Sequence, residues 1–335
     1  MSPSELSPEE IRRQLIDLLS GFMRTQAISV ATRLGVPDVV SSTPSDIGDI
    51  ARAVGADESA LYRLMRYLAT EGIFTEDAAR AFSETPLSVG LRSDAPATAR
   101  WLALMLGAQH YGAWGEALHS FVTGEPAFDH VHGKSFFEYL GDHPDLSRIF
   151  DSAMAAGARG RAAALAEYDW SDVGRVVDVG GGNGAALAIV LARHPHLRGT
   201  VFDLPTVVDG AANILSAAGV QDRCEVAGGN FFVDDLPRAD VYVLSQILHD
   251  WNDERAGAIL DNCRRGLTEH DRLLLMEGIL EDGPDSAFHK LLDLHMLVLL
   301  GGKERTETEW RSLLAEHGFG VQRITESGLI EARPV

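Results

Sequence analysis

Apolar residues recur every three or four positions along the first part of the chain, a spacing that is typical of amphipathic helices. Near the N-terminus these residues are Ile11, Leu15, Leu18, Leu19 and Phe22. Further helices are predicted over residues 46–54 and 57–70, with Asp57 as the N-cap of the second. Residues 71–91 predict a small two-stranded wing. Together these elements indicate a winged helix-turn-helix, which serves either for DNA binding or as a scaffold for packing and dimerisation.

Residues 97–168 continue the helical pattern and carry many large side chains. We expect most of them to be core, because aromatic residues at helical spacing usually are; they are Trp101, Met105, His110, Trp114, Phe121, Phe128, Phe136, Phe137, Phe150 and Met154. A minority should line a substrate pocket, and our candidates are Trp101, Met105, Trp114, Phe136, Phe150 and Met154.

The pattern changes at Gly174, where short apolar runs begin to alternate with helices. The strand candidates are residues 175–181, 199–205, 224–232, 240–248, 271–280 and 319–327. Strand–helix alternation predicts an α/β fold with a parallel, doubly wound sheet. The last two apolar runs, 319–325 and 328–334, predict a closing antiparallel hairpin. We therefore expect three parts: 1–95, a helical segment over 96–170, and a nucleotide-type domain over 171–335.

A glycine-rich loop follows the first strand of this domain. Gly180, Gly182 and Ala185 satisfy the dinucleotide pattern G-x-G-x-x-A. Asp203 ends the next strand and can bind the two hydroxyls of a ribose, which fits both NAD and S-adenosylmethionine (SAM). A tight turn without a ligand is a third possibility. Asp178, just before the glycines, can face the amino group of a ligand, and this favours SAM.

Six sequence motifs occur together in the order and at about the spacing of one family: "VVDVGGGNGA", "FDLP", "GGNFF", "LHDW", "LMEGIL" and "GGKERTETEW". With them the chain resembles the SAM-dependent O-methyltransferases of the plant caffeic-acid and isoflavone type. It looks closer to their bacterial relatives in antibiotic and phenazine biosynthesis. The resemblance covers essentially the whole chain. It implies a Rossmann-like class I methyltransferase sheet and a mainly helical, winged-helix-like N-terminal dimerisation domain, and hence a homodimer.

The resemblance also implies which residues contact SAM and its product S-adenosylhomocysteine. The glycines would pass under the methionine part, Asp203 would hold the ribose, and the adenine would meet Asn230 and Phe231. The full expected set is Asp178, Gly180, Gly182, Asp203, Leu204, Asn230, Phe231, Ser245, Gln246 and Asp250. Two positions depart from the family: Asn230 replaces a common aspartate, and Ser245 replaces the lysine of the plant enzymes.

By the same resemblance, His249 would be the general base, flanked by Glu277 and Glu304. An aromatic hydroxyl with a pKa near ~10 is mostly protonated at neutral pH, and a histidine with a pKa near ~6.5 can remove its proton. A carboxylate on the far ring nitrogen would orient the imidazole. Asp293 and His295 interrupt an apolar helix; they are either satisfied core polar groups or substrate contacts. No cluster shows convincing metal-ligand spacing, so we expect no metal.

Composition narrows the function classes. The net charge is −20, and residues 1–170 carry 14 basic against 23 acidic side chains, which argues against nucleic-acid and membrane partners. Two cysteines cannot form a disulfide framework and fit a reducing cytoplasm. No apolar run reaches the ~20 residues of a membrane span. The leading hypothesis is O-methylation of a small aromatic hydroxyl. A hydroxylase-like relative, a SAM-sensing regulator and a nicotinamide oxidoreductase remain as alternatives.

Overall fold

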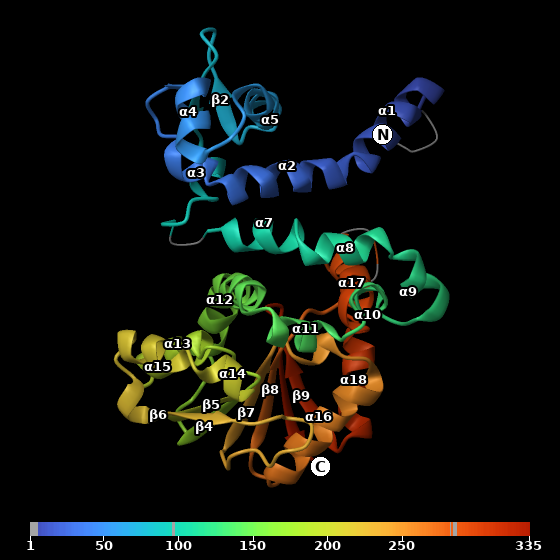
Figure 1. The fold of residues 1–335 in the computed structure, drawn as a ribbon. Helices are drawn as coiled ribbons and strands as arrows, with labels where there is room; N and C mark the ends of the chain where they lie inside the picture. Colours follow the sequence, from blue (N-terminus) through green and yellow to red (C-terminus); the bar gives the residue numbers. More distant parts are fainter. Residues whose placement is uncertain (1–5, 96–97, 282, 284–286) are drawn as a thin grey trace. The chain divides into compact units, whose positions relative to one another are not determined.

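A computed structural model describes residues 6–95, 98–281, 283 and 287–335 of the chain (Figure 1). The chain divides into two compact units, Met1–Tyr111 and Gly112–Val335. Each unit has its own hydrophobic core and is described by itself.

The N-terminal unit is mainly helical with one small sheet. Its elements are α1 (Pro8–Leu19), α2 (Gly21–Leu34), α3 (Val36–Val39), β1 (Ser45–Asp46), α4 (Ile47–Val54), α5 (Glu58–Thr70), β2 (Phe74–Glu76), β3 (Ala81–Glu84), α6 (Pro86–Val89), α7 (Arg100–Leu106) and the start of α8 (Gln109–Gly115). The strands form a three-stranded sheet in the order β1-β3-β2, so the predicted wing has one strand more than expected.

Local sequence explains the two helices of the winged-helix part. The carboxylates of Asp46 and Asp57 accept hydrogen bonds from the backbone N–H groups of Gly48 and Ala60, which caps the free N–H groups at the start of α4 and α5. Gly55 adopts a φ of 68° and ends α4, since a left-handed residue stops the helix. The predicted N-cap at Asp57 is confirmed.

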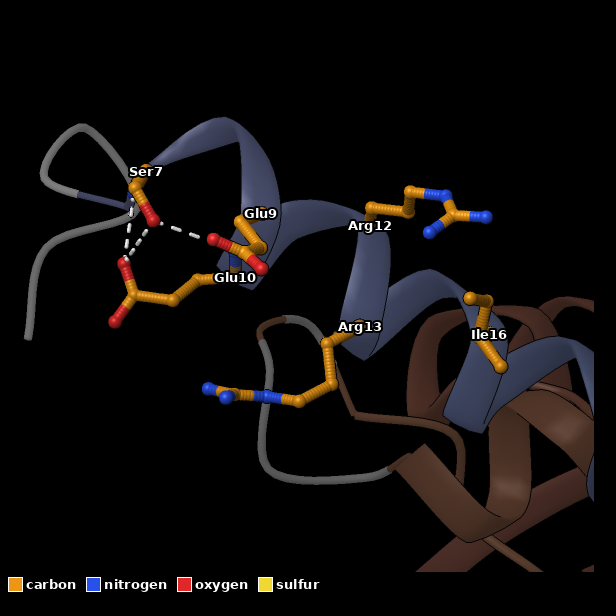
Figure 2. Close-up of a pocket in the computed structure, with 6 residues that line it drawn as sticks. All are labelled: Ser7, Glu9, Glu10, Arg12, Arg13 and Ile16. Atoms are coloured by element: carbon orange, nitrogen blue, oxygen red, sulfur yellow. Dashed lines mark hydrogen bonds between the residues drawn. The ribbon is translucent and has the colours of Figure 1, made fainter.

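The first helix exposes its apolar side chains. A capping box between Ser7 and Glu10 starts α1, as Figure 2 shows, and a hollow along this helix is lined by Ser7, Glu9, Glu10, Arg12, Arg13 and Ile16. None of the expected site residues lies in this hollow. No residue of α1 is buried, and Leu18 is 74% exposed. The predicted apolar stripe extends over two helices, because α1 ends at Leu19 and α2 begins at Gly21.

The C-terminal unit is built around a seven-stranded sheet. Its elements are α9 (Leu118–Thr123), α10 (Ala127–His132), α11 (Phe136–Asp142), α12 (Pro144–Ala166), β4 (Arg175–Val179), α13 (Ala185–Arg193), β5 (Arg198–Asp203), α14 (Pro205–Val208), α15 (Ala211–Ala217), η2 (Gln221–Arg223), β6 (Cys224–Gly228), β7 (Val241–Ser245), η3 (Leu248–Asp250), α16 (Asp253–Gly266), β8 (Arg272–Met276), α17 (Ala287–Leu300), α18 (Glu307–Glu316), β9 (Phe319–Ile324) and β10 (Leu329–Pro334).

The strand order is β6-β5-β4-β7-β8-β10-β9, with every pair parallel except β8–β10 and β9–β10. The predicted doubly wound sheet and its closing hairpin are confirmed. Helices α13 and α15 cover one face of the sheet, while α16 and α18 cover the other (Figure 1). Parallel strands bring their carboxyl ends to one edge, so residues that follow β4, β5, β7 and β8 gather there.

Several strands of this unit were predicted too long: those over 224–232 and 271–280 end at Gly228 and Met276. The strand predicted over 240–248 ends at Ser245, because Gln246 takes a left-handed φ of 57° and a short 3-10 helix follows. Phe121 is 56% exposed and so is not one of the majority of large side chains that form the core. Elsewhere Phe128 and Phe136 are buried as expected. Among the residues that the structure describes, no helix is long and apolar enough to cross a membrane.

Candidate active site

The glycine loop lies between β4 and α13 and leaves its backbone open. Gly180, Gly182 and Gly184 all have positive φ angles, between 59° and 77°, which side chains rarely allow. A Cβ at Gly180 would lie 2.5 Å from the side chain of Ile247, whereas a Cβ at Gly182 would have no neighbour within 4 Å. The loop therefore packs tightly on one side and leaves space for a ligand over Gly182.

Carboxylates surround this loop. Asp203 accepts hydrogen bonds from the backbone N–H groups of Gly182 (2.9 Å) and Leu204 (2.7 Å), so it shapes the loop directly. Asp178 is fully buried, and burial together with the charge of Asp203 raises its pKa to about 7. Asp151 of α12 has its pKa raised to about 6 by burial and by the charge of the same Asp203. Three acids, Asp178, Asp203 and Asp151, thus lie near one another. No positively charged side chain is among the causes of their pKa shifts.

This arrangement distinguishes between the two cofactors that the glycine pattern left open. The pyrophosphate of NAD would bring two negative charges beside Asp178 and Asp203, which repel each other already. SAM brings a sulfonium and an ammonium group, and a cation here lowers the free energy of both ionised acids. The residues present therefore fit SAM.

The expected adenine residues follow β6. The side-chain oxygen of Asn230 accepts a hydrogen bond from the backbone N–H of Phe232 (2.9 Å), so the amide supports its own turn. We expected this oxygen to accept from an adenine amino group, and that contact must share it with Phe232. Phe231 lies 3.6 Å from the position of a Cβ at Gly180, beside the glycine loop. Leu204 is partly exposed at the end of β5.

His249 stands in η3, between two carboxylates. Its Nδ1 lies 2.7 Å from Oε1 of Glu304, and its Nε2 lies 3.3 Å from Oδ1 of Asp250. Burial alone would lower the pKa of His249, but Asp250, Glu304 and Glu277 outweigh burial and raise it to about 9. These carboxylates therefore favour the protonated form of the imidazole.

Glu277, directly after β8, holds the turn that leads to His249. Its Oε1 accepts hydrogen bonds from the backbone N–H groups of Ile247 (3.0 Å) and Leu248 (2.9 Å), and Oε2 lies 3.4 Å from the side-chain amide of Gln246. We expected Glu277 to orient the imidazole ring directly. In the structure Glu277 instead binds the backbone N–H groups just before His249. It affects the imidazole ring only through its charge.

Glu304 is positioned by two features of the chain around it. Its backbone N–H donates to Oδ1 of Asp293 on α17 at 2.9 Å. A Cβ at Gly278 would lie 2.5 Å from Oε2 of Glu304, so a glycine is needed there. Of the two roles left open for Asp293, this contact favours the satisfied core group.

The expected substrate residues fall in both units. In the C-terminal unit, Trp114 donates its indole N–H to Nδ1 of His295 at 2.8 Å. Because burial lowers the pKa of His295 to about 4, this ring is neutral. Phe136 and Phe150 pack edge-to-face in one apolar cluster, while Met154 is 38% exposed on α12. Trp101 and Met105 belong to the N-terminal unit and stay predictions.

The structure places three residues at this edge that were not among the expected site residues, and of these Phe137 was expected only as core. Phe137 packs against Trp251, next to the His249 turn, with ring centroids 5.7 Å apart. Asp151 joins the acids around Asp203. Arg305, inside the motif "GGKERT", is fully buried and donates to the backbone around His249. A charged residue in the middle of a motif was the available signal for Arg305.

Within the described part of the chain, no group of three or more His, Cys, Asp and Glu side chains suits a metal ion.

Comparison with known proteins identifies the family. The model of the O-methyltransferase domain matches residues 114–320, and that of the O-methyltransferase dimerisation domain matches residues 16–108. The chain is 43% identical to a phenazine O-methyltransferase of Lysobacter antibioticus over 96% of each chain. The crystal structure of LaPhzM superposes with a TM-score of 0.92 at 42% identity, covering 97% of this chain and 99% of the other.

A second solved structure contains the product of the cofactor. An O-methyltransferase from neocarzinostatin biosynthesis, in complex with S-adenosylhomocysteine and 1,4-dihydroxy-2-naphthoic acid, has a TM-score of 0.84 at 35% identity over 95% of this chain and 98% of the other. The family model covers most of the chain, and the relatives match both units. The chain belongs to the family of SAM-dependent O-methyltransferases.

Proposed function

We propose that this O-methyltransferase methylates an aromatic hydroxyl of a small, polycyclic natural product, phenazine-like or polyketide-like, and that His249 is its general base. The observation that carries the proposal is the buried pair of His249 and Glu304, 2.7 Å apart, at the sheet edge that also holds the glycine loop. The names of the relatives support the acceptor class, since one acts on a phenazine and another was crystallised with a dihydroxynaphthoic acid.

SAM, when bound, supplies an electrophilic methyl group on a sulfonium. The glycine loop gives its backbone to the methionine part over Gly182, where a Cβ would have no neighbour within 4 Å. Asp178 balances the ammonium charge, and Asp203 accepts from the ribose hydroxyls while keeping the loop in shape through Gly182. The adenine would be contacted by Asn230, Phe231 and the residues near Leu204.

His249 prepares the nucleophile. Glu304 fixes the proton of the imidazole on Nδ1, so that Nε2 is the nitrogen that takes the hydroxyl proton. The positive charge that forms on the ring is stabilised by Glu304, Asp250 and Glu277. Alignment of the oxygen with the methyl group is the remaining task, and proximity with orientation contributes several kcal/mol in such reactions.

The acceptor pocket is apolar with one polar element. Phe150 and Met154 are proposed to supply an aromatic and aliphatic wall, and the neutral Trp114–His295 pair a polar edge, whereas Phe136 is 2% exposed and belongs to the core behind them. Such walls suit a flat, fused-ring acceptor. Trp101 and Met105, which belong to the N-terminal unit, stay predicted substrate residues.

The assembly is proposed to be a homodimer through the N-terminal unit. The dimerisation model matches residues 16–108, and α1 and α2 expose large apolar side chains, among them Leu15, Leu18 and Met23. The division into parts over 1–95, 96–170 and 171–335 and the cytoplasmic location stay predictions. The two cysteines, Cys224 and Cys263, are free and buried.

A methylation screen tests the proposal. The purified protein would be incubated with SAM and a panel of phenols, hydroxyphenazines, hydroxynaphthoates and aromatic amines, and products would be detected by mass spectrometry. We expect a mass gain of one methylene on hydroxylated fused rings. His249→Ala should lower turnover by about 10²–10⁴ while SAM affinity persists. Methylation of the amines alone, or full turnover in His249→Ala, contradicts the proposal.

A further inference from the structure

Arg305 places a buried cation behind the proposed base. Its side chain is 0% exposed and lies over the ring of Trp310, with the guanidinium carbon 5.0 Å from the ring centroid. Nη1 donates to the carbonyl of Leu248 at 3.1 Å, and Nη2 donates to the carbonyl of Trp251 at 2.9 Å. Nε donates to the carboxylate of Asp253 at 2.9 Å. Nη1 also donates to the carbonyl of Lys303 at 3.4 Å, so one planar group holds all these acceptors in fixed directions.

These contacts bracket His249. Leu248 precedes it and Trp251 follows two positions later, so the guanidinium joins the two ends of the turn that carries the imidazole. The carbonyl of His249 itself accepts from the backbone N–H of Lys303 at 3.0 Å. A Cβ at Gly302 would lie 2.2 Å from that carbonyl oxygen, so the two segments are in direct contact.

The start of the same turn is also held by a buried anion. Glu277 accepts hydrogen bonds from the backbone N–H groups of Ile247 and Leu248, while Arg305 donates to the carbonyls of Leu248 and Trp251. A carboxylate that binds N–H groups and a guanidinium that binds carbonyls each match the partial charge of the backbone atoms they contact. The backbone of the turn is therefore fixed by an anion at its start and by a cation that joins its start to its end.

We infer that Arg305 is a positioning residue for His249, fixing the direction of its imidazole relative to the acceptor hydroxyl. The inference rests on the proposed role of His249 as the base. Arg305 touches neither cofactor nor acceptor in this assignment and acts only through the turn. Arginine is required because its planar fork reaches several carbonyls and a carboxylate at once, whereas a lysine ammonium is a single point charge.

The test compares Arg305→Lys with a matched variant, Arg223→Lys. Arg223 also donates to backbone carbonyls, those of His194, Leu197 and Leu191, but it lies in η2 beside β6, away from the His249 turn. Turnover would be measured on two acceptors, a phenol of ordinary pKa and an analogue of low pKa that is already ionised. SAM affinity would be measured by calorimetry, and stability by thermal melting.

We expect Arg305→Lys to lose about 10- to 100-fold in kcat on the ordinary phenol, as a misplaced catalytic group does. The loss should shrink to less than about threefold on the ionised acceptor, since no base is needed there. SAM affinity should stay unchanged. Arg223→Lys should lower the melting temperature without this dependence on the acceptor. Should Arg305→Lys not fold, Asp253→Ala removes the carboxylate acceptor and should give the same pattern more weakly.

Two results overturn the inference. If Arg305→Lys loses turnover equally on both acceptors, or if Arg223→Lys gives the same dependence on acceptor pKa, Arg305 is a structural residue only. The variant His249→Ala separates this failure from failure of the proposed function. If His249→Ala keeps full turnover on the ordinary phenol, the base assignment fails and the positioning role fails with it. If His249→Ala depends on acceptor pKa and Arg305→Lys does not, only the role of Arg305 is refuted.

Discussion

Replacing Glu304 by glutamine should change the pH dependence of catalysis while keeping the geometry of the site. Oε1 of Glu304 lies 2.7 Å from Nδ1 of His249, and a glutamine oxygen can accept the same hydrogen bond. Only the negative charge is lost. That charge is one of the causes that raise the pKa of His249 to about 9, so the pKa falls in the variant.

The size of the effect follows from the pairing. A loss of one pKa unit corresponds to about 1.4 kcal/mol, and we expect at least this from a buried partner in direct contact. With a pKa of about 9, only about 1% of the imidazole is neutral at pH 7; with a value of about 8, about 10% is. The weaker base then accepts the proton about threefold more slowly, if half of the drop in its pKa is expressed in the free energy of the transition state. The variant should therefore equal or exceed the native enzyme near pH 7 and fall below it near pH 10.

The assay is the pH profile of kcat/KM for an acceptor of ordinary pKa at saturating SAM, which adds the same positive charge to both proteins. Glu331→Gln is the control, because Glu331 is also a buried glutamate, pairs with Arg323 at 2.9 Å and lies on β10. Its profile should match the native one. A Glu304→Gln profile whose rising limb stays in place, or moves to higher pH, refutes the claim that this carboxylate sets the pKa of the base.

Three further outcomes are expected at other positions. Asp203→Ala should weaken SAM binding by about 2–4 kcal/mol in calorimetry, if two buried hydrogen bonds to the ribose are lost; unchanged affinity refutes the ribose contact. SAM affinity should fall as pH drops below the pKa of about 7 of Asp178, because a protonated acid must lose its proton before it can balance a cation, and Asp178→Asn should abolish this pH dependence. Leu18→Asp, on the exposed face of α1, should shift light scattering from dimer towards monomer; an unchanged dimer places the interface elsewhere.

Much of the fold followed from periodicity. The parallel sheet, the closing hairpin and the N-cap of α5 all depend on short-range patterns that a single sequence displays. The strand before His249 was predicted too long because Ile247 and Leu248 continue its apolar run. Only the left-handed φ of Gln246, which a sequence does not reveal for a residue other than glycine, shows where β7 ends.

The sequence predicted which residues form the site better than it predicted which of them contact one another. His249 and Glu277 follow the parallel strands β7 and β8, as expected, and Glu304 meets them from the connection between α17 and α18. Which acid contacts the imidazole depends on backbone atoms that a sequence motif does not show. Asp293 likewise fixes Glu304 through a backbone N–H, a contact between two elements that no side-chain pattern reveals.

The division of labour between Glu277 and Glu304 has a physical reason. A carboxylate that accepts two backbone N–H groups, as Glu277 does, has little capacity left to turn toward a ring, whereas Oε2 of Glu304 is buried without a hydrogen-bond partner in the described structure. Glu304 therefore directs its other oxygen, Oε1, to His249. One acid fixes where the base stands and the other sets how basic it is. The two glutamates should then fail differently: loss of Glu277 should misplace the turn, and loss of the Glu304 charge should move the pH profile.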